Sequence, residues 1–114
     1  MTETNQDLTI YKSKTTMVVV PNLNHPIELT VLYDDNDKVI RISVNDNNHE
    51  TSHWVRGCFS FVNMLLAKET PMEVIITELC SIMGHNESYY IPKSKGLFVT
   101  SILSHIGHTL KKII

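Results

Sequence analysis

The 114-residue sequence lacks the features that would place it in a membrane, outside the cell or on a nucleic acid. No apolar run approaches the ~20 residues of a membrane-spanning helix, and no charged-then-apolar segment typical of an export signal begins the chain. The formal net charge of −2 gives no general attraction for DNA or RNA. We therefore expect a cytoplasmic protein with no membrane partner and no nucleic-acid partner.

Cysteine is scarce, and the residue patterns of familiar enzymes are absent. The only two cysteines, Cys58 and Cys80, have no C-x-x-C spacing, which favours reduced core thiols over a disulfide or a metal role. There is no G-x-S-x-G, no glycine-rich phosphate loop followed by Lys-Ser or Lys-Thr, and no base beside either cysteine. These absences predict a non-enzymatic protein without catalytic residues, cofactor or metal. A small hydrolase with an unrecognised His/Glu pair is the alternative.

The length of the chain suits one domain with a modest core. We expect a flexible, polar N-terminus over residues 1–10 and a single domain over residues 11–114. Charge is unevenly distributed, because residues 1–50 hold eight acidic side chains against four Lys or Arg, whereas residues 88–114 hold four lysines and no acid. This basic end suits a small anion or an acidic patch on a partner. Solubilising lysines on an exposed face are the alternative.

The first half of the chain has the pattern of β-strands, which we predict over residues 15–20, 27–33 and 38–44. The turn-forming residues Asp34–Asp37 lie between the last two strands and favour a hairpin. Alternation in the third strand predicts that Ile40 and Ile42 share one face and that Val39 lies on the other. A three-stranded antiparallel meander with one buried face follows.

The second half of the chain has the spacing of amphipathic helices. The first helix is predicted to have Thr51 or Ser52 as its cap. The second has the clearest local signal, because residues 70–73 (T-P-M-E) combine a cap, a proline at the first helical position and a glutamate at the third. This pattern predicts a capping box at Thr70, and Gly84 is placed to end the helix.

A third helix ends the sequence, with Thr100 or Ser101 as its predicted N-cap. Its apolar face is predicted to consist of Ile102, Ile106, Leu110 and Ile113. Strands that precede helices, rather than alternate with them, predict an α+β fold. We expect a three-stranded antiparallel meander followed by three helices packed on one face.

This order of elements, and the Thr-Ser pair at the last helix, resemble the TSCPD domain family. That small domain lies at the C-terminus of B12-dependent ribonucleotide reductases and is named for a Thr-Ser-Cys-Pro-Asp motif, where residues 100–104 here read T-S-I-L-S. The resemblance covers about residues 10–114. It implies the same fold, while the missing Cys, Pro and Asp imply binding rather than cysteine chemistry. A free-standing chain of this kind also looks like small proteins encoded by bacteriophages.

The loop over residues 45–53 is the first candidate ligand site. Asn-rich turns tolerate left-handed backbone, and the helix start that follows offers unpaired amides and a positive dipole end that can hold a phosphate. Hydrogen-bond donors and a ring for stacking would come from Asn47, His49, Thr51, Ser52, His53, Trp54 and Arg56. A plain turn, a capped helix and Trp54 in the core are the alternative.

The segment over residues 84–96 is the second candidate, together with the start of the last helix. Connections of this length are often functional, tyrosine rings offer stacking surface, and lysines attract phosphate. The predicted ligand-binding residues are Tyr89, Tyr90, Lys93, Lys95, Thr100 and Ser101. A disordered connector with one tyrosine pinned to the core is the alternative.

Two histidine pairs, His49/His53 and His105/His108, have spacings that can place both imidazoles on one helix face, as a zinc site requires. No H-E-x-x-H motif or carboxylate partner completes either set, although Glu50 sits beside His49. We predict a polar helix surface at both pairs and no metal.

Together these observations predict a small binding module that holds a nucleotide-like anion and forms a homo-oligomer. If the protein is phage-encoded, the resemblance suggests a sponge in the host cytoplasm that sequesters a host nucleotide defence signal. The resemblance also implies the main alternative, a protein-docking accessory or regulator of ribonucleotide reductase or of another host enzyme.

Overall fold

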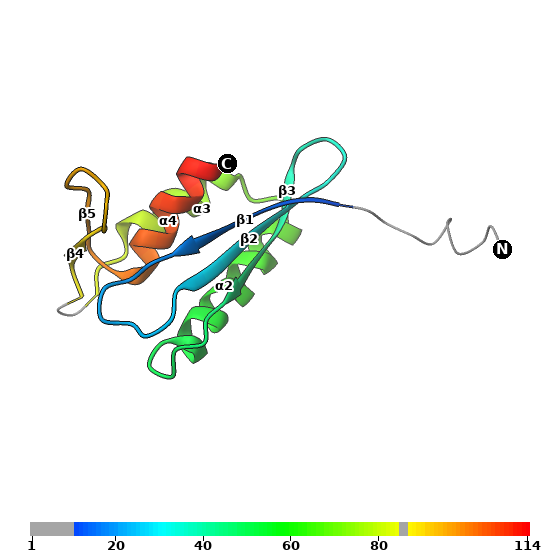
Figure 1. Cartoon of the computed structure of the whole chain (residues 1–114). Helices are drawn as coiled ribbons and strands as arrows, with labels where there is room; N and C mark the ends of the chain where they lie inside the picture. The colour runs from blue at the N-terminus through cyan, green and yellow to red at the C-terminus, as the bar shows by residue number, and fades with distance from the viewer. Residues whose placement is uncertain (1–10, 85–86) are drawn as a thin grey trace.

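A three-stranded antiparallel sheet forms the first half of the structure (Figure 1). The structure is a computed structural model that describes residues 11–84 and 87–114, so the predicted flexible segment 1–10 lies outside the described residues. The predicted meander is confirmed. Its strands are β1 (Lys12–Val18), β2 (Ile27–Tyr33) and β3 (Val39–Asn45), paired in the order β1-β2-β3.

β1 begins earlier than the predicted strand 15–20, because Lys12 pairs with Tyr33 at the far end of β2. Backbone groups form this ladder, so polar side chains do not prevent it. The ammonium group of Lys14 donates a hydrogen bond to the backbone oxygen of Ile113 (2.9 Å). This contact ties the polar end of β1 to the end of the last helix.

A bulge between β2 and β3 decides which side chains of β3 reach the core. The register shifts between Leu32 and Tyr33, so that Tyr33 pairs with Val39. A shift of one residue turns side chains to the other face of a sheet, and as a result Val39 and Ile42 are buried while Ile40 is half-buried. The predicted face of this strand was therefore wrong at Val39 and Ile40.

Three helices follow in the described part of the chain: α2 (Ser52–Ala67), α3 (Met72–Ser81) and α4 (Ile102–Ile113). α2 packs against β3, α4 packs against β1, and α3 packs against α4. The helices lie on one side of the sheet (Figure 1), toward which β2 turns its fully buried side chains. The predicted α+β fold is confirmed. None of the described helices is both long enough and apolar enough to cross a lipid bilayer.

The start of α4 has the predicted cap. Ser101 is the N-cap, and its hydroxyl oxygen accepts a hydrogen bond from the backbone N–H of Ser104 (3.0 Å). The apolar face of α4 also lies where the spacing predicts it. Ile102, Ile106 and Leu110 are buried, and Ile113 is half-buried.

The capping box predicted at Thr70 was wrong. α3 begins at Met72, and its N-cap is Pro71, which makes no side-chain cap hydrogen bond. Pro71 has an extended backbone (ψ 136°), so the helix starts one residue too late for the Thr70 hydroxyl to reach its first amides. The helix ends at Ser81, before the predicted Gly84.

A short hairpin that the sequence pattern did not predict lies between α3 and α4. Its strands are β4 (Tyr89–Tyr90) and β5 (Phe98–Val99). The rings of Tyr90 and Phe98 meet edge to face, with centroids 5.0 Å apart. Strands of two residues are too short to show alternation, so residues 84–96 predicted only a long loop. The hairpin lies beside α4 at one end of the molecule (Figure 1).

Candidate anion-binding site

A crevice of about 320 Å³ lies between the loop of the β4–β5 hairpin and α4, and we call it the hairpin–α4 crevice. The hairpin contributes Ile91, Ser94 and Leu97 to its lining. The helix contributes His105, His108, Thr109, Lys111 and Lys112. Most of these helix residues are three or four positions apart, which places them along one side of α4.

Hydrogen bonds within the loop hold the hairpin side of the crevice. The backbone N–H of Ile91 donates to the backbone oxygen of Leu97 (2.8 Å). The Ser94 hydroxyl donates to the backbone oxygen of Ile91 (2.6 Å) and accepts from the backbone N–H of Leu97 (3.1 Å). Left-handed backbone at Lys93 and Gly96 completes the turn. Residues 91–97 thus form a hydrogen-bonded turn, and Tyr89 packs against the core, as the alternative of a connector with one pinned tyrosine also predicted.

Tyr89 and His105 connect the hairpin to the helix, and of the two only His105 lines the crevice. The Tyr89 hydroxyl lies 2.7 Å from Nδ1 of His105, and the two rings meet edge to face with centroids 5.5 Å apart. Burial and the nearby His108 lower the pKa of His105 to about 4. Burial, with a contribution from Glu87, raises the pKa of Tyr89 above its usual value.

Both side chains are therefore uncharged at neutral pH. The Tyr89 hydroxyl can donate its hydrogen to Nδ1 of His105, which leaves the ring hydrogen of the histidine on Nε2. His105 is only 4% exposed, so the polar helix surface predicted at this residue was wrong, and its ring lines the crevice. In this tautomer the histidine ring is neutral and carries its hydrogen on Nε2, so it adds no positive charge to the crevice.

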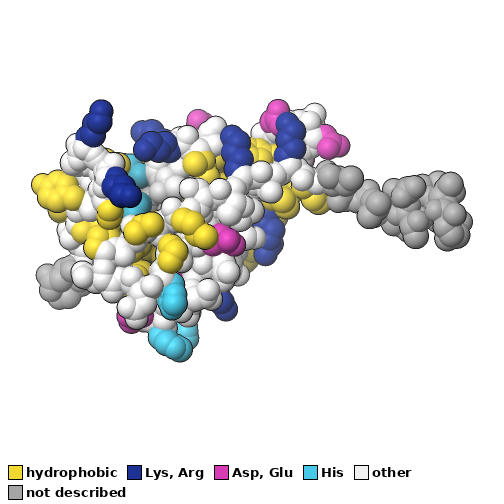
Figure 2. Space-filling view, viewed as in Figure 1, with side chains coloured by type: hydrophobic (Ala, Val, Ile, Leu, Met, Phe, Trp, Pro, Cys, Tyr) yellow, Lys and Arg dark blue, Asp and Glu magenta, His cyan; other side chains and the backbone are white. Residues whose placement is uncertain are grey.

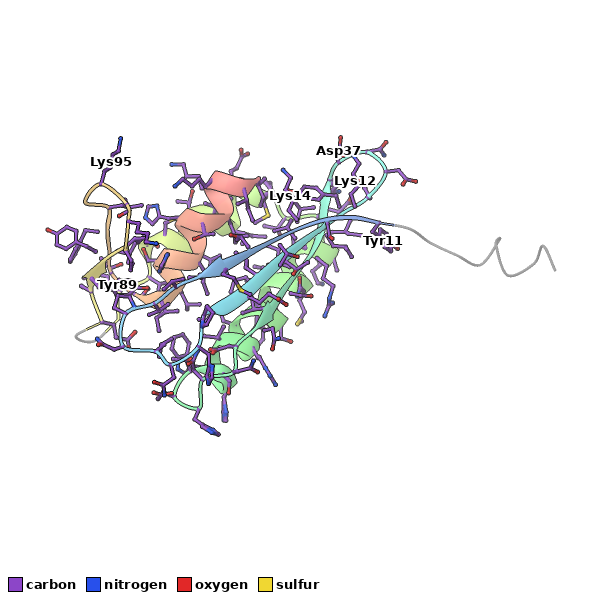
Figure 3. All side chains as sticks on the ribbon, in the orientation of Figure 1. Tyr11, Lys12, Lys14, Asp37, Tyr89 and Lys95 are labelled. Atoms are coloured by element: carbon purple, nitrogen blue, oxygen red, sulfur yellow. The ribbon has the colours of Figure 1, made fainter. Side chains whose placement is uncertain are left out.

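Positive charge comes instead from Lys111 and Lys112, which line the crevice, and from Lys93 and Lys95, which lie near it without lining it. Lys111 and Lys112 lie in the last turn of α4, and Lys93 and Lys95 lie in the hairpin loop. None of these four lysines forms an ion pair within the described residues, and no carboxylate lines the crevice there. Figure 2 shows Lys or Arg side chains gathered around a histidine at this end of the molecule, and Figure 3 places Lys95 at the tip of the hairpin and Tyr89 at its base.

Of the two adjacent tyrosines, only Tyr89 packs inward. Tyr90 is 64% exposed and contacts Phe98 on the outside of the hairpin, away from the lining of the crevice. The hydroxyls of Thr100 and Ser101 both donate to the backbone oxygen of Ile82 (2.7 Å each). These two hydroxyls hold the end of α3 against the start of α4, and their predicted contact with a ligand stays a prediction.

In the first candidate loop, the structure shows a buried polar cluster around Asp46. Oδ1 of Asp46 accepts hydrogen bonds from the backbone N–H (3.0 Å) and the side-chain amide (2.7 Å) of Asn48. Oδ2 accepts from the Thr51 hydroxyl (2.6 Å). A buried carboxylate therefore lies beside the N-terminus of α2, where the sequence predicted that an anionic ligand would bind.

The other predicted residues of this loop do not line a common pocket. Ser52 is half-buried, and the exposed ones are Asn47, His49, His53, Trp54 and Arg56. Arg56 lines a separate groove between β3 and α2, together with Arg41. Trp54 is 40% exposed, so the alternative that placed this ring in the core was wrong.

Sequence reasoning noted the basic C-terminal segment and the His105/His108 pair but did not assign them to the ligand site. The signal was available in the spacing of His105, His108 and Lys112 on one side of a helix. The sequence did not show that Ser94 lies above this helix, because the position of Ser94 depends on the hairpin. Within residues 11–84 and 87–114, no three His, Cys, Asp or Glu side chains are grouped so that they could hold a metal ion.

Comparison with known proteins adds no relative. No family model matches the chain, and no curated protein and no solved structure matches it. The resemblance to the TSCPD family stays a proposal that rests on the order of elements and on Thr100 and Ser101.

Proposed function

We propose that the protein is a small non-enzymatic module that binds a nucleotide-like anion in the hairpin–α4 crevice. One observation carries this proposal: the crevice joins lysines from α4 to a preformed hairpin loop and contains no carboxylate in its described lining. Lysine ammonium groups attract phosphate as point charges. A phosphorylated ligand is therefore favoured over a neutral or cationic one.

The remaining lining suits the other half of a nucleotide. Ile91 and Leu97 offer an apolar wall, and the neutral N–H of His105 offers a directional donor. Pockets for small molecules combine such apolar walls with a few placed polar groups, and about 320 Å³ lies at the small end of their usual range. The crevice therefore fits one nucleotide-sized ligand, with its phosphate toward Lys111 and Lys112.

The same contacts favour binding over catalysis. Two hydroxyls line the crevice, and each donates to a backbone carbonyl: Ser94 to Ile91 (2.6 Å) and Thr109 to His105 (2.9 Å). Neither is paired with a base that could activate it as a nucleophile. His105 has too low a pKa to act as an acid at neutral pH. The ligand should therefore be released unchanged, as a sequestering protein of phage origin would require.

Native mass spectrometry of the freshly purified protein, followed by calorimetry with mono-, di- and cyclic nucleotides, tests this proposal. We expect one ligand per crevice, and heating the complex should return the ligand intact. A cleaved product would show that the protein is an enzyme. The absence of heat with every nucleotide would contradict the proposal, and co-purification with a reductase or another enzyme would then support the docking alternative.

A further inference from the structure

α2 has a second apolar face, in addition to the one that packs on the sheet. The buried side chains of α2 are Val55, Phe59, Val62 and Leu66. A separate set of large apolar side chains is exposed: Trp54 (40%), Phe61 (67%), Met64 (54%) and Leu65 (44%). With Gly57, these residues recur at the three-and-four spacing of one helix side, and we call them the outer face of α2. Within α2, no charged residue belongs to this face.

Gly57 lies in the middle of the outer face, and nothing within the protein explains why it is a glycine. A Cβ atom built at Gly57 meets no other atom within 4 Å. Its backbone is ordinary helix, without the positive φ that would favour glycine. Glycine inside a helix costs about 0.5–1 kcal/mol relative to alanine. The glycine leaves a notch in this face, with room for another backbone or side chain to approach the helix closely.

We propose that the outer face of α2 is the interface of a symmetric homodimer, in which α2 packs antiparallel against α2 of a second copy. The face is self-complementary, because its most exposed side chain, Phe61, lies about one turn from the notch at Gly57. Around a two-fold axis near residue 59, Phe61 packs onto Gly57 of the partner subunit, and the partner's Phe61 packs onto Gly57. Such reciprocity is what an isologous interface requires.

Charge complementarity at the rim supports a second copy over a different partner. The same antiparallel register places Trp54 opposite Met64 of the partner subunit. It also brings the turn before α2, which holds Glu50, toward the end of the partner's helix, where Lys68 of the partner subunit follows. Glu50 and Lys68 are both exposed, and neither forms an ion pair within the described residues. Each dimer would therefore gain two Glu–Lys pairs, which set orientation more than affinity.

The exposed area is also compatible with a dimer. Four large apolar side chains that are about half exposed present on the order of 400 Å². A standard interface buries about 800 Å² on each partner, with an apolar centre and a polar rim. The outer face would supply the centre, and the residues around it, including Glu50 and Lys68, would supply the rim.

Sedimentation velocity or light scattering over a range of concentrations tests the dimer. We expect the unmodified protein to have twice the chain mass of 13.0 kDa, and Phe61→Lys to be monomeric. Gly57→Leu fills open space and favours helix, so it should keep the protomer folded and still abolish the dimer. Met83→Lys changes a side chain that is 79% exposed after the end of α3 and should leave the dimer intact.

A charge exchange then tests the register. Glu50→Lys and Lys68→Glu should each weaken self-association, because each places like charges opposite one another. Mixing the two variants should restore association as a heterodimer with both pairs attractive, and the double variant should restore the homodimer. The proposal is overturned if the unmodified protein stays monomeric, if Phe61→Lys and Gly57→Leu both remain dimeric, or if mixing restores nothing. The outcome does not depend on whether the crevice binds a nucleotide.

Discussion

Tyr89 and His105 join the β4–β5 hairpin to α4 through a hydroxyl-to-Nδ1 contact of 2.7 Å. The hairpin has only two residues in each strand, so its own ladder contributes little to its position. The part-buried contact between a neutral tyrosine and a neutral histidine therefore helps to set the height of the hairpin loop above the helix. The shape of the crevice depends on this pair.

The first prediction concerns the hydroxyl of Tyr89. Tyr89→Phe leaves Nδ1 of the buried His105 without its partner, and we expect the free energy of unfolding to fall by roughly 1–3 kcal/mol. Urea denaturation followed by circular dichroism measures the loss. Tyr90→Phe is the matched control, because that ring lies on the outside of the hairpin and is 64% exposed. Equal losses in both variants would contradict the assigned role of Tyr89.

The second prediction concerns stability at acid pH. The pKa of His105 is lowered to about 4 in the folded protein, against about 6.5 in an unfolded chain. The unfolded state therefore binds the extra proton first, and the stability contributed by neutral His105 is lost as the pH falls from about 6.5 to about 4. Below that window the loss is complete.

Denaturation midpoints at several pH values should show this loss. In His105→Gln, the side-chain oxygen can still accept a hydrogen bond from Tyr89. Its denaturation midpoint should therefore fall less between pH 6.5 and about 4 than that of the unmodified protein. His53→Gln, which changes an exposed histidine, should follow the unmodified curve. A parallel curve for His105→Gln would show that this histidine does not titrate as its burial requires.

The third prediction concerns the lysines of the crevice. Lys111→Ala and Lys112→Ala should each weaken binding of the best nucleotide by roughly tenfold, because each removes a charge-assisted contact to phosphate. The salt dependence of binding should also flatten. Lys93→Ala and Lys95→Ala should act in the same direction if the hairpin loop closes over the ligand. Calorimetry at two salt concentrations measures both effects.

Lys12→Ala is the control for these variants. Lys12 is exposed and pairs with Asp37 (2.6 Å) at the β2–β3 turn, and Figure 3 places both residues at the opposite end of the molecule from Lys95. Its loss lowers the total charge by the same amount without touching the crevice. If Lys12→Ala weakens binding as much as Lys112→Ala, the attraction is general rather than local.

The fourth prediction concerns the buried carboxylate of Asp46. Asp46→Ala leaves the Thr51 hydroxyl and two N–H groups of Asn48 without their acceptor, and we expect a loss of roughly 2–3 kcal/mol in unfolding free energy. Asn47→Ala alters the exposed neighbour and should change stability little. Nucleotide affinity of the folded fraction should stay unchanged in both variants. A loss of affinity in Asn47→Ala would instead support the first candidate loop as the ligand site.

The fifth prediction concerns the contact between α3 and α4. A Cβ atom at Gly107 would lie 2.9 Å from both the backbone nitrogen of Cys80 and Cβ of Leu79. Gly107→Ala must therefore push the two helices apart, at a cost of about 1–3 kcal/mol, although alanine is the better helix former. Thermal unfolding should show a lower midpoint. An unchanged or higher midpoint would mean that the helices can separate without loss of packing.

Features that depend only on residues close together in the sequence could be predicted from the sequence. The span of β2 follows from its alternation, and the cap of α4 follows from Ser101, because a hydroxyl reaches an amide three residues away without help from the rest of the fold. The capping box at Thr70 failed for an equally local reason, since the extended backbone of Pro71 moves the helix start beyond its reach. The order of strands and helices was sufficient to predict the fold class.

The candidate site could be predicted only in part. Lys93, Lys95 and Tyr89 were expected near a ligand, but Ser94, His108 and Lys112 come together only because the hairpin folds back over α4. No local pattern encodes that approach. The hydroxyls of Thr100 and Ser101 were expected to face a ligand, yet their backbone partner at Ile82 lies nearly twenty positions away in the sequence.

By itself, the sequence determined the order of the three long strands and of the helices that follow them, and where the last helix begins, because those outcomes depend on hydrogen bonds and side-chain spacing within a few residues. Only the tertiary structure decided that the β4–β5 hairpin folds back over α4 and brings Ser94 close to His108 and Lys112. The spacing of side chains within one segment does not encode this approach, because it depends on contacts between segments that are separate in the sequence.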